Sequence, residues 1–523
     1  MYKPVFLVIL DGWGISPNKE GNAIRKAVLP TIDKLNRNYP LLSLQASGIS
    51  VGIPWGEPGN SEVGHTTLGS GKIIYQNLPR ITLAIQNKSF FTNKVTFSAM
   101  ENASKNNKAL HLMGLVGDGS VHSHVDHLYA FLEMAIAQKL KKVYIHIFTD
   151  GRDSPPNSGV ATVEKLQERL PHTGVGKIAT ICGRNWAMDR NNNWDRIGKA
   201  YRMLVDSEGK KNTDPIKYLK ESYKKNITDE YIEPGIIIGD DGQPVGSVKD
   251  GDSIIFFNFR RDRARQLTEA FVIPEFKKIK KKKNPKVHFT TLTEYEKDLP
   301  VSIIFAPEKA THGLGEILSK HNKNQLRIAE TEKYAHVTYF FNGGKENAWS
   351  GEDRILVPSP SVSKYDEEPE MSAAEITQKA IEGIELNKYD FVLMNYANPD
   401  MVGHTGNIEA AIQAVQSVDK SLSILIPKVL ETGGCLLITA DHGNVEEMKD
   451  PYTGQLMTSH STNPVPLWFI TGTNHRKRTE ADITNSQNNI HGLLSDIAPT
   501  ILEIMNIKKA PEMNGESLLP ELQ

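Results

Sequence analysis

Short apolar runs recur along the chain, and each is followed by a turn and then by a helical pattern. Seven of these runs have the length of a buried strand, at residues 5–10, 110–115, 143–148, 177–181, 253–257, 391–394 and 435–439. Residues 128–140, 372–386 and 408–430 instead carry apolar side chains at three- and four-residue spacing, as amphipathic helices do. Strands that alternate with helices predict an α/β fold built on parallel sheets.

The length of the chain predicts two domains. A single hydrophobic core stops growing at roughly 250–300 residues, and this chain has 523. Two segments are typical of crossings between domains: a polar stretch with Pro79 at residues 75–80, and a stretch containing Gly and Pro at residues 306–315. If both are boundaries, residues 77–308 form a second α/β domain that is inserted into a discontinuous first domain, residues 1–76 and 309–523.

Composition and charge exclude several classes of protein. The chain has 61 basic and 62 acidic side chains and a net charge of −1, which argues against a partner that is a nucleic acid or a membrane. No window reaches the roughly 18 apolar residues of a membrane span. Cys182 and Cys435 form no disulfide framework or zinc-ribbon spacing, so a cytoplasmic location is expected. The lysine-rich run at residues 277–283 is interpreted as a solvated loop or helix end.

Residue types that bind metals follow strands or lie in glycine-rich turns at residues 10–14, 59–65, 398–406 and 439–444. Each segment alone also fits a turn, a helix cap or a surface histidine. Together they supply the hydroxyl of Ser61 and, with a further histidine downstream, six metal-type side chains: Asp11, Asp400, His404, Asp441, His442 and His460. This set suffices for two divalent cations, and its mixed oxygen and nitrogen atoms suit Mn²⁺ or Zn²⁺ better than Ca²⁺ or Mg²⁺.

Ser61 has the surroundings expected of a nucleophile. A bound divalent cation can lower the pKa of a serine hydroxyl and hold it in line with a phosphorus atom. Gly59 and Gly64 allow the backbone to turn sharply around the exposed side chain. Ser61 also fits the N-cap of a helix with Glu62 in its first turn, and the two roles are compatible.

Five arginines follow strands in the middle of the chain: Arg152, Arg184, Arg190, Arg260 and Arg263. Guanidinium groups bind carboxylate and phosphate oxygens through paired hydrogen bonds. The cluster therefore predicts a small substrate that carries both groups. Arg261 is a weaker candidate, because alternation of side chains points it away from its neighbours.

Six motifs, in order along the chain, resemble those of the cofactor-independent (2,3-bisphosphoglycerate-independent) phosphoglycerate mutases of the alkaline phosphatase superfamily. They are Leu-Asp-Gly-Trp-Gly at 10–14, Gly-Asn-Ser-Glu-Val-Gly-His at 59–65, Val-His-Ser-His-Val-Asp-His at 121–127, Thr-Asp-Gly-Arg-Asp at 149–153, Asn-Phe-Arg-Arg-Asp-Arg at 258–263 and Thr-Ala-Asp-His-Gly-Asn at 439–444. The resemblance implies an alkaline-phosphatase-like domain with an inserted domain. It also implies interconversion of 3-phosphoglycerate and 2-phosphoglycerate in glycolysis and gluconeogenesis, without added 2,3-bisphosphoglycerate.

The resemblance further implies a role for individual residues. Ser61 is the residue phosphorylated in mid-reaction, Lys333 neutralises the phosphoryl group, and Asp153 is the acid/base on the substrate hydroxyls. One metal is held by Asp400, His404 and His460, and the other by Asp11, Ser61, Asp441 and His442. The substrate is positioned by His122 together with Arg152, Arg184, Arg190, Arg260 and Arg263. The expected metal is Mn²⁺, with Zn²⁺ or Co²⁺ as alternatives, and the expected oligomeric state is a monomer.

Three other interpretations stay open. A metal-dependent phosphatase or phosphopentomutase of the same superfamily keeps the metal residues without needing the arginines, and a non-catalytic binding protein tolerates loss of Ser61. Residues 122–127 also fit the His-x-His-x-Asp-His pattern of dinuclear zinc hydrolases of the metallo-β-lactamase type. Because those hydrolases are built mainly on antiparallel sheets, we expect only His122 to face substrate and His124, Asp126 and His127 to be structural.

Overall fold

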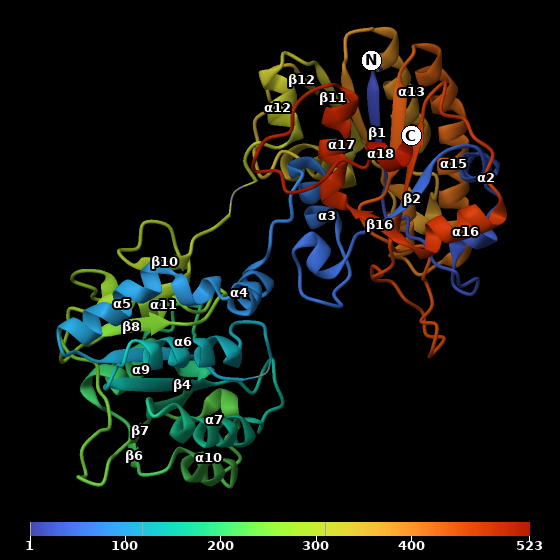
Figure 1. The fold of residues 1–523 in the computed structure, drawn as a ribbon. Coiled ribbons are helices and arrows are strands. Elements are labelled where there is room, and N and C mark those ends of the chain that lie inside the picture. Colours follow the sequence, from blue (N-terminus) through green and yellow to red (C-terminus); the bar gives the residue numbers. More distant parts are fainter. Residues whose placement is uncertain (1, 118, 309) are drawn as a thin grey trace. The chain divides into compact units, whose positions relative to one another are not determined.

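The computed structural model describes residues 2–117, 119–308 and 310–523, which form two compact units (Figure 1). The first unit consists of Met1–Gln76 and Glu308–Gln523, and the second of Asn77–Pro307. In the described residues, each unit contains one eight-stranded, mainly parallel sheet with helices packed on it. This architecture confirms the predicted α/β fold class with two domains.

The first unit is built around strand β1 (Val5–Leu10), whose six residues are all buried. β1 lies between and parallel to β13 (Phe391–Tyr396) and β14 (Cys435–Thr439). The full order is β12 (Glu352–Val357), β11 (Gln325–Glu330), β13, β1, β14, β15 (Val465–Ile470), β2 (Leu41–Gln45) and β16 (Ile490–Leu493). Strands covered on both faces have no polar side to alternate with, which explains the uninterrupted apolar runs of β1 and β14.

The helices of the first unit include the long α15 (Ile408–Glu431), which packs on α13 (Ala373–Glu385). The others are α1 (Ala23–Lys26), α2 (Pro30–Asn38), α3 (Ser61–Ser70), α12 (Leu314–Lys320), α14 (Asn398–Gly403), α16 (Glu480–Asn488), α17 (Ile497–Ile504) and α18 (Leu519–Leu522). None of the helices in the described part of the chain combines the length and apolar character that a membrane crossing requires.

The second unit has the strand order β10 (Ser302–Phe305), β9 (His288–Thr293), β8 (Ser253–Phe256), β3 (Leu110–Leu115), β4 (Val143–Thr149), β5 (Lys177–Gly183), β7 (Gly235–Ile237) and β6 (Lys210–Asn212). Its helices are α4 (Asn77–Gln86), α5 (Lys94–Lys105), α6 (Val125–Ala137), α7 (Gly159–Thr173), α8 (Arg184–Ala187), α9 (Trp194–Asp206), α10 (Pro215–Tyr223) and α11 (Arg265–Val272). The neighbouring pairs β9–β8, β8–β3, β3–β4 and β4–β5 are parallel, whereas β7 is antiparallel to β5.

All seven predicted strands and all three predicted helices are present, with shifts at their ends. The largest shift is in α6, which begins at Val125 rather than residue 128. The reason is local, because the His124 side chain accepts a hydrogen bond from the backbone N–H of Asp126 and so caps the helix three residues early. Cys182 and Cys435 are buried free thiols in β5 and β14.

The lysine-rich run at residues 277–283 has no helix or strand, in agreement with its interpretation as a loop. Its side chains are partly held by aromatic rings. The Lys278 ammonium lies 4.5 Å from the ring centroid of Trp194, and Lys281 lies 5.1 Å from that of Tyr201. Such cation–π contacts account for the attachment of a basic loop to an ordinary domain surface.

Candidate functional site

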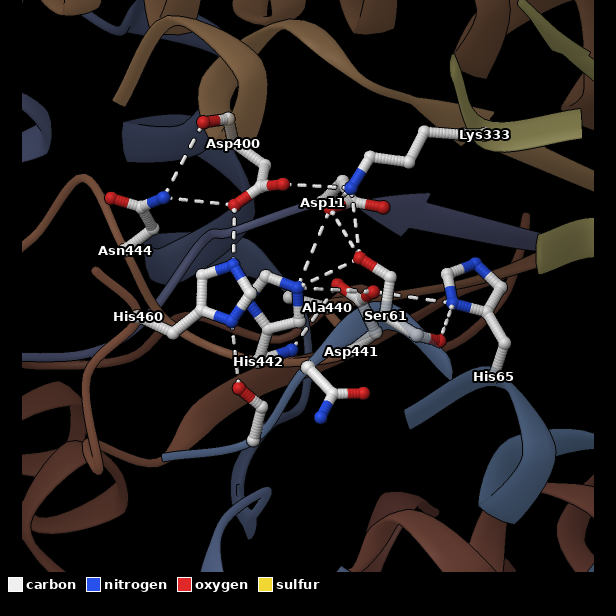
Figure 2. Close-up of polar contacts among 12 residues, drawn as sticks. Asp11, Ser61, His65, Lys333, Asp400, Ala440, Asp441, His442, Asn444 and His460 are labelled. Carbon is white, nitrogen blue, oxygen red and sulfur yellow. Dashed lines mark hydrogen bonds and ion pairs between the residues drawn. The ribbon is translucent and has the colours of Figure 1, made fainter. Parts of the chain in front are cut away.

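The predicted acidic residues of the first unit meet at one edge of its sheet. Asp11 follows β1, Asp441 follows β14, and Asp400 lies in α14 directly after β13. These three strands are neighbours and parallel, so their carboxyl ends deliver all three side chains to the same place (Figure 2). All three carboxylates are buried.

Ser61 is the first residue of helix α3, and Asn60 rather than Ser61 caps that helix. The Asn60 side chain accepts a hydrogen bond from Val63 N at 3.1 Å. The Ser61 hydroxyl is therefore free to face the site, where it lies 3.0 Å from His442 Nε2 and 3.4 Å from Asp11 Oδ1. Gly64 makes this approach possible, because a Cβ there would lie 2.7 Å from the backbone oxygen of Asp441.

Lys333 places its ammonium group at the centre of the cluster, although it comes from the short 3₁₀ segment after β11. Its Nζ donates hydrogen bonds to Asp11 Oδ1 at 2.7 Å, Ser61 Oγ at 2.8 Å and Asp400 Oδ2 at 2.7 Å (Figure 2). Burial by itself lowers the pKa of Lys333, but Asp11 and Asp400 together raise it above its usual value. The side chain therefore stays charged.

The carboxylates nevertheless outnumber this one cation. Burial and the charge of Asp441 raise the pKa of Asp11 to about 7. Burial also opposes ionisation of Asp400, but the charge of Lys333 holds the pKa of Asp400 well below its usual value. Three buried carboxylates beside a single ammonium leave an excess of negative charge that favours the binding of further cations.

The three predicted histidine ligands share one hydrogen-bonding pattern. The Nδ1–H group of His404 donates to Thr458 O at 2.7 Å, that of His442 to Gly443 O at 3.3 Å, and that of His460 to Gly59 O at 2.8 Å. Each Nε2 is left facing the cluster. The Nε2 atoms of His404 and His460 lie 3.4 and 3.3 Å from Asp400 Oδ1. A backbone carbonyl on the far nitrogen is the usual way in which proteins orient a metal-binding imidazole.

The side chains present fit divalent cations. Two groups have ligand atoms that all lie within 4.8 Å of one another, namely Asp400 with His442 and His460, and Asp11 with His65 and Asp441. The Oδ2 atom of Asp441 is buried and accepts no hydrogen bond from the described residues. The cluster thus brings carboxylate oxygens and imidazole nitrogens close together.

His65 and Asn395 belong to this cluster, and our sequence analysis assigned them no role. His65 Nδ1 donates to the backbone oxygen of Ser61 at 2.9 Å and lies 3.2 Å from Asp441 Oδ2. Asn395 Nδ2 donates to Asp11 Oδ2 at 2.7 Å and lies 3.2 Å from His65 Nε2. The spacing of four residues between Ser61 and His65 on one helix was the available signal, whereas nothing in the sequence distinguishes Asn395 from other strand residues.

In the second unit, the predicted substrate-binding residues gather around carboxylates. Arg184 is buried, and its Nη1 donates to Asp150 Oδ1 and Asp153 Oδ2, both at 2.5 Å. His122 Nε2 lies 3.6 Å from the same Asp153 oxygen. Burial, followed by the charge of Arg184, lowers the pKa of His122 to about 4, so its ring is neutral.

A second carboxylate, Asp262, joins two further arginines to this group. Asp262 pairs with Arg190 at 3.1 Å and with Arg260 at 3.2 Å, and it lies 3.7 Å from His122 Nδ1. Our sequence analysis missed both Asp150 and Asp262, although they lie inside the motifs at 149–153 and 258–263.

The two remaining predicted arginines are less tightly held. Arg152 pairs with Glu230 at 3.4 Å, and Arg263 donates to Met188 O at 3.2 Å. Burial, followed by the charges of Arg184, Arg190 and Arg152, lowers the pKa of Arg263. This mutual repulsion reflects a concentration of positive charge suited to an anionic ligand.

The alternative zinc-hydrolase pattern has a different geometry. His124 caps α6, and His127 is buried with neither ring nitrogen hydrogen-bonded in the described part of the chain. Among those same residues, neither of the two candidate metal-binding groups includes a residue from 122–127.

Comparisons with known proteins agree with these observations. A family model described as "BPG-independent PGAM N-terminus" matches residues 81–297. The 2,3-bisphosphoglycerate-independent phosphoglycerate mutases of Clostridium perfringens (strain SM101 / Type A) and Acetivibrio thermocellus are each 50% identical to this chain, and each alignment covers 99% of both chains. The crystal structure of Leishmania mexicana phosphoglycerate mutase at low cobalt concentration is 31% identical, covers 99% of this chain and 98% of that one, and has a TM-score of 0.51. The chain therefore belongs to the 2,3-bisphosphoglycerate-independent phosphoglycerate mutases, the isomerases that interconvert 3-phosphoglycerate and 2-phosphoglycerate.

Proposed function

We propose that this chain carries out the mutase reaction through a phosphoserine at Ser61. The observation that carries the proposal is the position of the Ser61 hydroxyl, within 3.4 Å of the Asp11 carboxylate, the His442 imidazole and the Lys333 ammonium. His442 is neutral at physiological pH because burial lowers its pKa to about 4. Its Nε2 can accept the hydroxyl hydrogen bond, and Lys333 supplies positive charge for the phosphoryl oxygens.

Two divalent cations per chain are part of the proposal. Asp400, His404 and His460 would hold one, and the other would be held by Asp11, Ser61, Asp441 and His442. Mn²⁺ suits this donor set, with Zn²⁺ and Co²⁺ as alternatives; the Leishmania mexicana relative was crystallised at low cobalt concentration. When bound, such cations lower the pKa of a hydroxyl and stabilise attacking and leaving oxygens in phosphoryl transfer.

The second unit would retain the glycerate between the two half-reactions. His122 and the five arginines, Arg152, Arg184, Arg190, Arg260 and Arg263, would bind the carboxylate and phosphate oxygens. Asp153 would give a proton to the glycerate oxygen that leaves when the phosphoserine forms, and would then accept the proton of the glycerate hydroxyl that attacks the phosphoserine. Its contacts with Arg184 and His122 support this role, because they fix the carboxylate beside the positively charged cluster.

The proposal assigns metal binding and substrate binding to different parts of the chain. Residues 1–76 and 309–523 would form the metal-binding, phosphatase-like domain, and residues 77–308 the substrate-binding domain. We further propose that the enzyme acts as a cytoplasmic monomer on free phosphoglycerate, since that substrate is an intermediate of glycolysis and gluconeogenesis. A phosphatase of the same superfamily would have no need of the arginine cluster.

The test is the chemical identity of the intermediate. Enzyme mixed with 3-phosphoglycerate and Mn²⁺ is quenched in acid, digested and analysed by mass spectrometry, and we expect phosphate on Ser61. Ser61→Ala should show no 2-phosphoglycerate formation without added bisphosphoglycerate, while Ser70→Ala, at the other end of the same helix, should stay active. Turnover by Ser61→Ala, or phosphate on another residue, would overturn the proposal.

A further inference from the structure

Glu446 is a buried carboxylate with four hydrogen-bond donors, all of them neutral groups. Its Oε2 accepts from the backbone N–H groups of Gly14 at 3.0 Å and Asn444 at 2.8 Å. Its Oε1 accepts from the Ser461 hydroxyl and from Asn463 Nδ2, the latter at 3.0 Å. The donors come from three segments of the chain: one at Gly14, one at Asn444, and one at residues 461–463. One side chain therefore holds these three segments together.

Two glycines allow the carboxylate to sit directly against the backbone. A Cβ on Gly14 would lie 2.2 Å from Glu446 Cδ, and a Cβ on Gly443 would lie 2.4 Å from Oε1. Neither distance is possible for real atoms. The glycines at these positions of the 10–14 and 439–444 motifs are therefore explained by the approach of Glu446.

Each segment that Glu446 binds also carries a proposed metal ligand. Gly14 closes the turn that begins at Asp11, and Ser461 directly follows His460. Asn444, whose backbone is held by Glu446, donates through Nδ2 to Asp400 Oδ1 at 2.8 Å. The backbone N–H of Ser461 in turn donates to Gly443 O at 3.0 Å, next to His442. The ligands of both proposed cations thus depend on segments that meet at one carboxylate.

We infer that Glu446 is a positioning residue that sets the affinity of this enzyme for divalent cations by fixing the separation of the ligand-bearing segments. The inference rests on the proposed metal ligands, but it concerns a residue that contacts none of the reacting atoms. Groups that orient metal ligands without binding the metal typically change its affinity by about 10–100-fold when they are removed. We expect an effect of that size here.

The experiment uses Glu446→Gln, which keeps the shape of the side chain but places an amide NH₂ against hydrogen-bond donors. Mn²⁺ is titrated into metal-depleted protein, and free Mn²⁺ is measured from its electron paramagnetic resonance signal. We expect the Kd for Mn²⁺ to rise by about 10–100-fold and the lost mutase activity to return as Mn²⁺ is raised. The matched control is Glu447→Gln, because the Glu447 carboxylate accepts from Asn463 at 3.1 Å but, in the described structure, forms no hydrogen bond with Gly14 or Asn444.

The possible outcomes separate this inference from the proposed function. If wild type binds Mn²⁺ and His460→Ala binds less of it, the metal ligands stand, and an unchanged Kd in Glu446→Gln overturns the inference alone. If wild type itself binds no Mn²⁺, the proposed metal centre fails. Should Glu446→Gln not fold, Ser461→Ala removes a single donor, and it must also weaken Mn²⁺ binding. A loss of activity that excess Mn²⁺ does not relieve, at unchanged Kd, would show that Glu446 acts only on the fold.

Discussion

His127 makes the second unit sensitive to acid, and replacing it should remove part of that sensitivity. The ring is fully buried in α6 against Phe259, and neither of its nitrogens has a hydrogen-bond partner in the described structure. Burial, followed by the charge of His124, lowers the pKa of His127 from its usual 6.5 to about 3. The folded protein therefore holds this histidine neutral at pH values where the unfolded chain binds a proton.

The sign and the size of the effect on stability follow from the difference between the pKa of His127 in the folded protein and in the unfolded chain. A histidine whose pKa is lowered by folding costs nothing above pH 6.5 and destabilises the fold as the pH falls from 6.5 toward 3. The cost is about 1.4 kcal/mol per pH unit, or about 2.7 kcal/mol at pH 4.5. Leucine cannot titrate. Between pH 7.0 and pH 4.5, the free energy of unfolding of His127→Leu should therefore rise relative to that of wild type by about 2.7 kcal/mol.

The assay is equilibrium unfolding in urea at pH 7.0, 5.5 and 4.5, with EDTA present so that metal release makes no contribution. The quantity compared is the difference in the free energy of unfolding between variant and wild type, because other titrating groups cancel in it. Leu128→Ala is the control, since that side chain is buried in the same helix and cannot titrate, so its loss should shift stability equally at every pH. A pH-independent difference for His127→Leu would refute the reasoning.

Three further outcomes are expected. Replacing His404 and His442 together by alanine should remove bound metal, whereas the same change at His124 and His127 should not, as metal analysis per chain will show. Arg260→Ala should lower 2-phosphoglycerate formation more than phosphate release, because glycerate would be held less tightly; the Arg260 side chain is half exposed, so the loss should be about 1 kcal/mol, or about fivefold in glycerate retention, and a proportional fall in both products would contradict this. Acidification from neutral pH should reduce activity reversibly, with the loss beginning above pH 6.5, and excess Mn²⁺ should relieve it, because the hydrogen bond with Asp400 raises the pKa of the proposed ligand His404 from 6.5 and protons compete with metal; a decline that is identical at low and saturating Mn²⁺ would count against it.

The predictions from sequence were most successful where a buried strand is followed by a proposed metal-binding residue. β1 and β14 are fully buried strands, so their runs are almost entirely apolar, and an acidic residue follows within two positions of the end of each strand. Asp11 and Asp441 stand at those points. Since the carboxyl ends of neighbouring parallel strands share one edge, the pattern of apolar runs was enough to bring both residues into one cluster.

The same reasoning failed for the edge strand β12 and its neighbour β11, and for contacts between residues that are remote in sequence. Strand β12 mixes exposed and buried residues, and β11 buries Arg327 completely, so neither has the apolar run by which strands were found. The hydrogen bond from Gly14 to Glu446 spans 432 positions. Contacts of that range leave no local pattern, because they depend on how strands are ordered in the sheet rather than on neighbours in the chain.

The electrostatics of the two units argue for a fixed order of events. In the first unit, Asp11, Asp400 and Asp441 surround a single Lys333, and the excess charge contributes to raising the pKa of Asp11 to about 7. A phosphoryl group with two negative charges is repelled by such a pocket until cations have balanced it. In the second unit, arginines outnumber the carboxylates that pair with them, and their mutual repulsion contributes to lowering the pKa of Arg263. Anion binding relieves that repulsion with no help from metal. We therefore expect phosphoglycerate to bind the proposed arginines of the metal-free protein, and transfer to the proposed nucleophile Ser61 to require that the carboxylates are first neutralised.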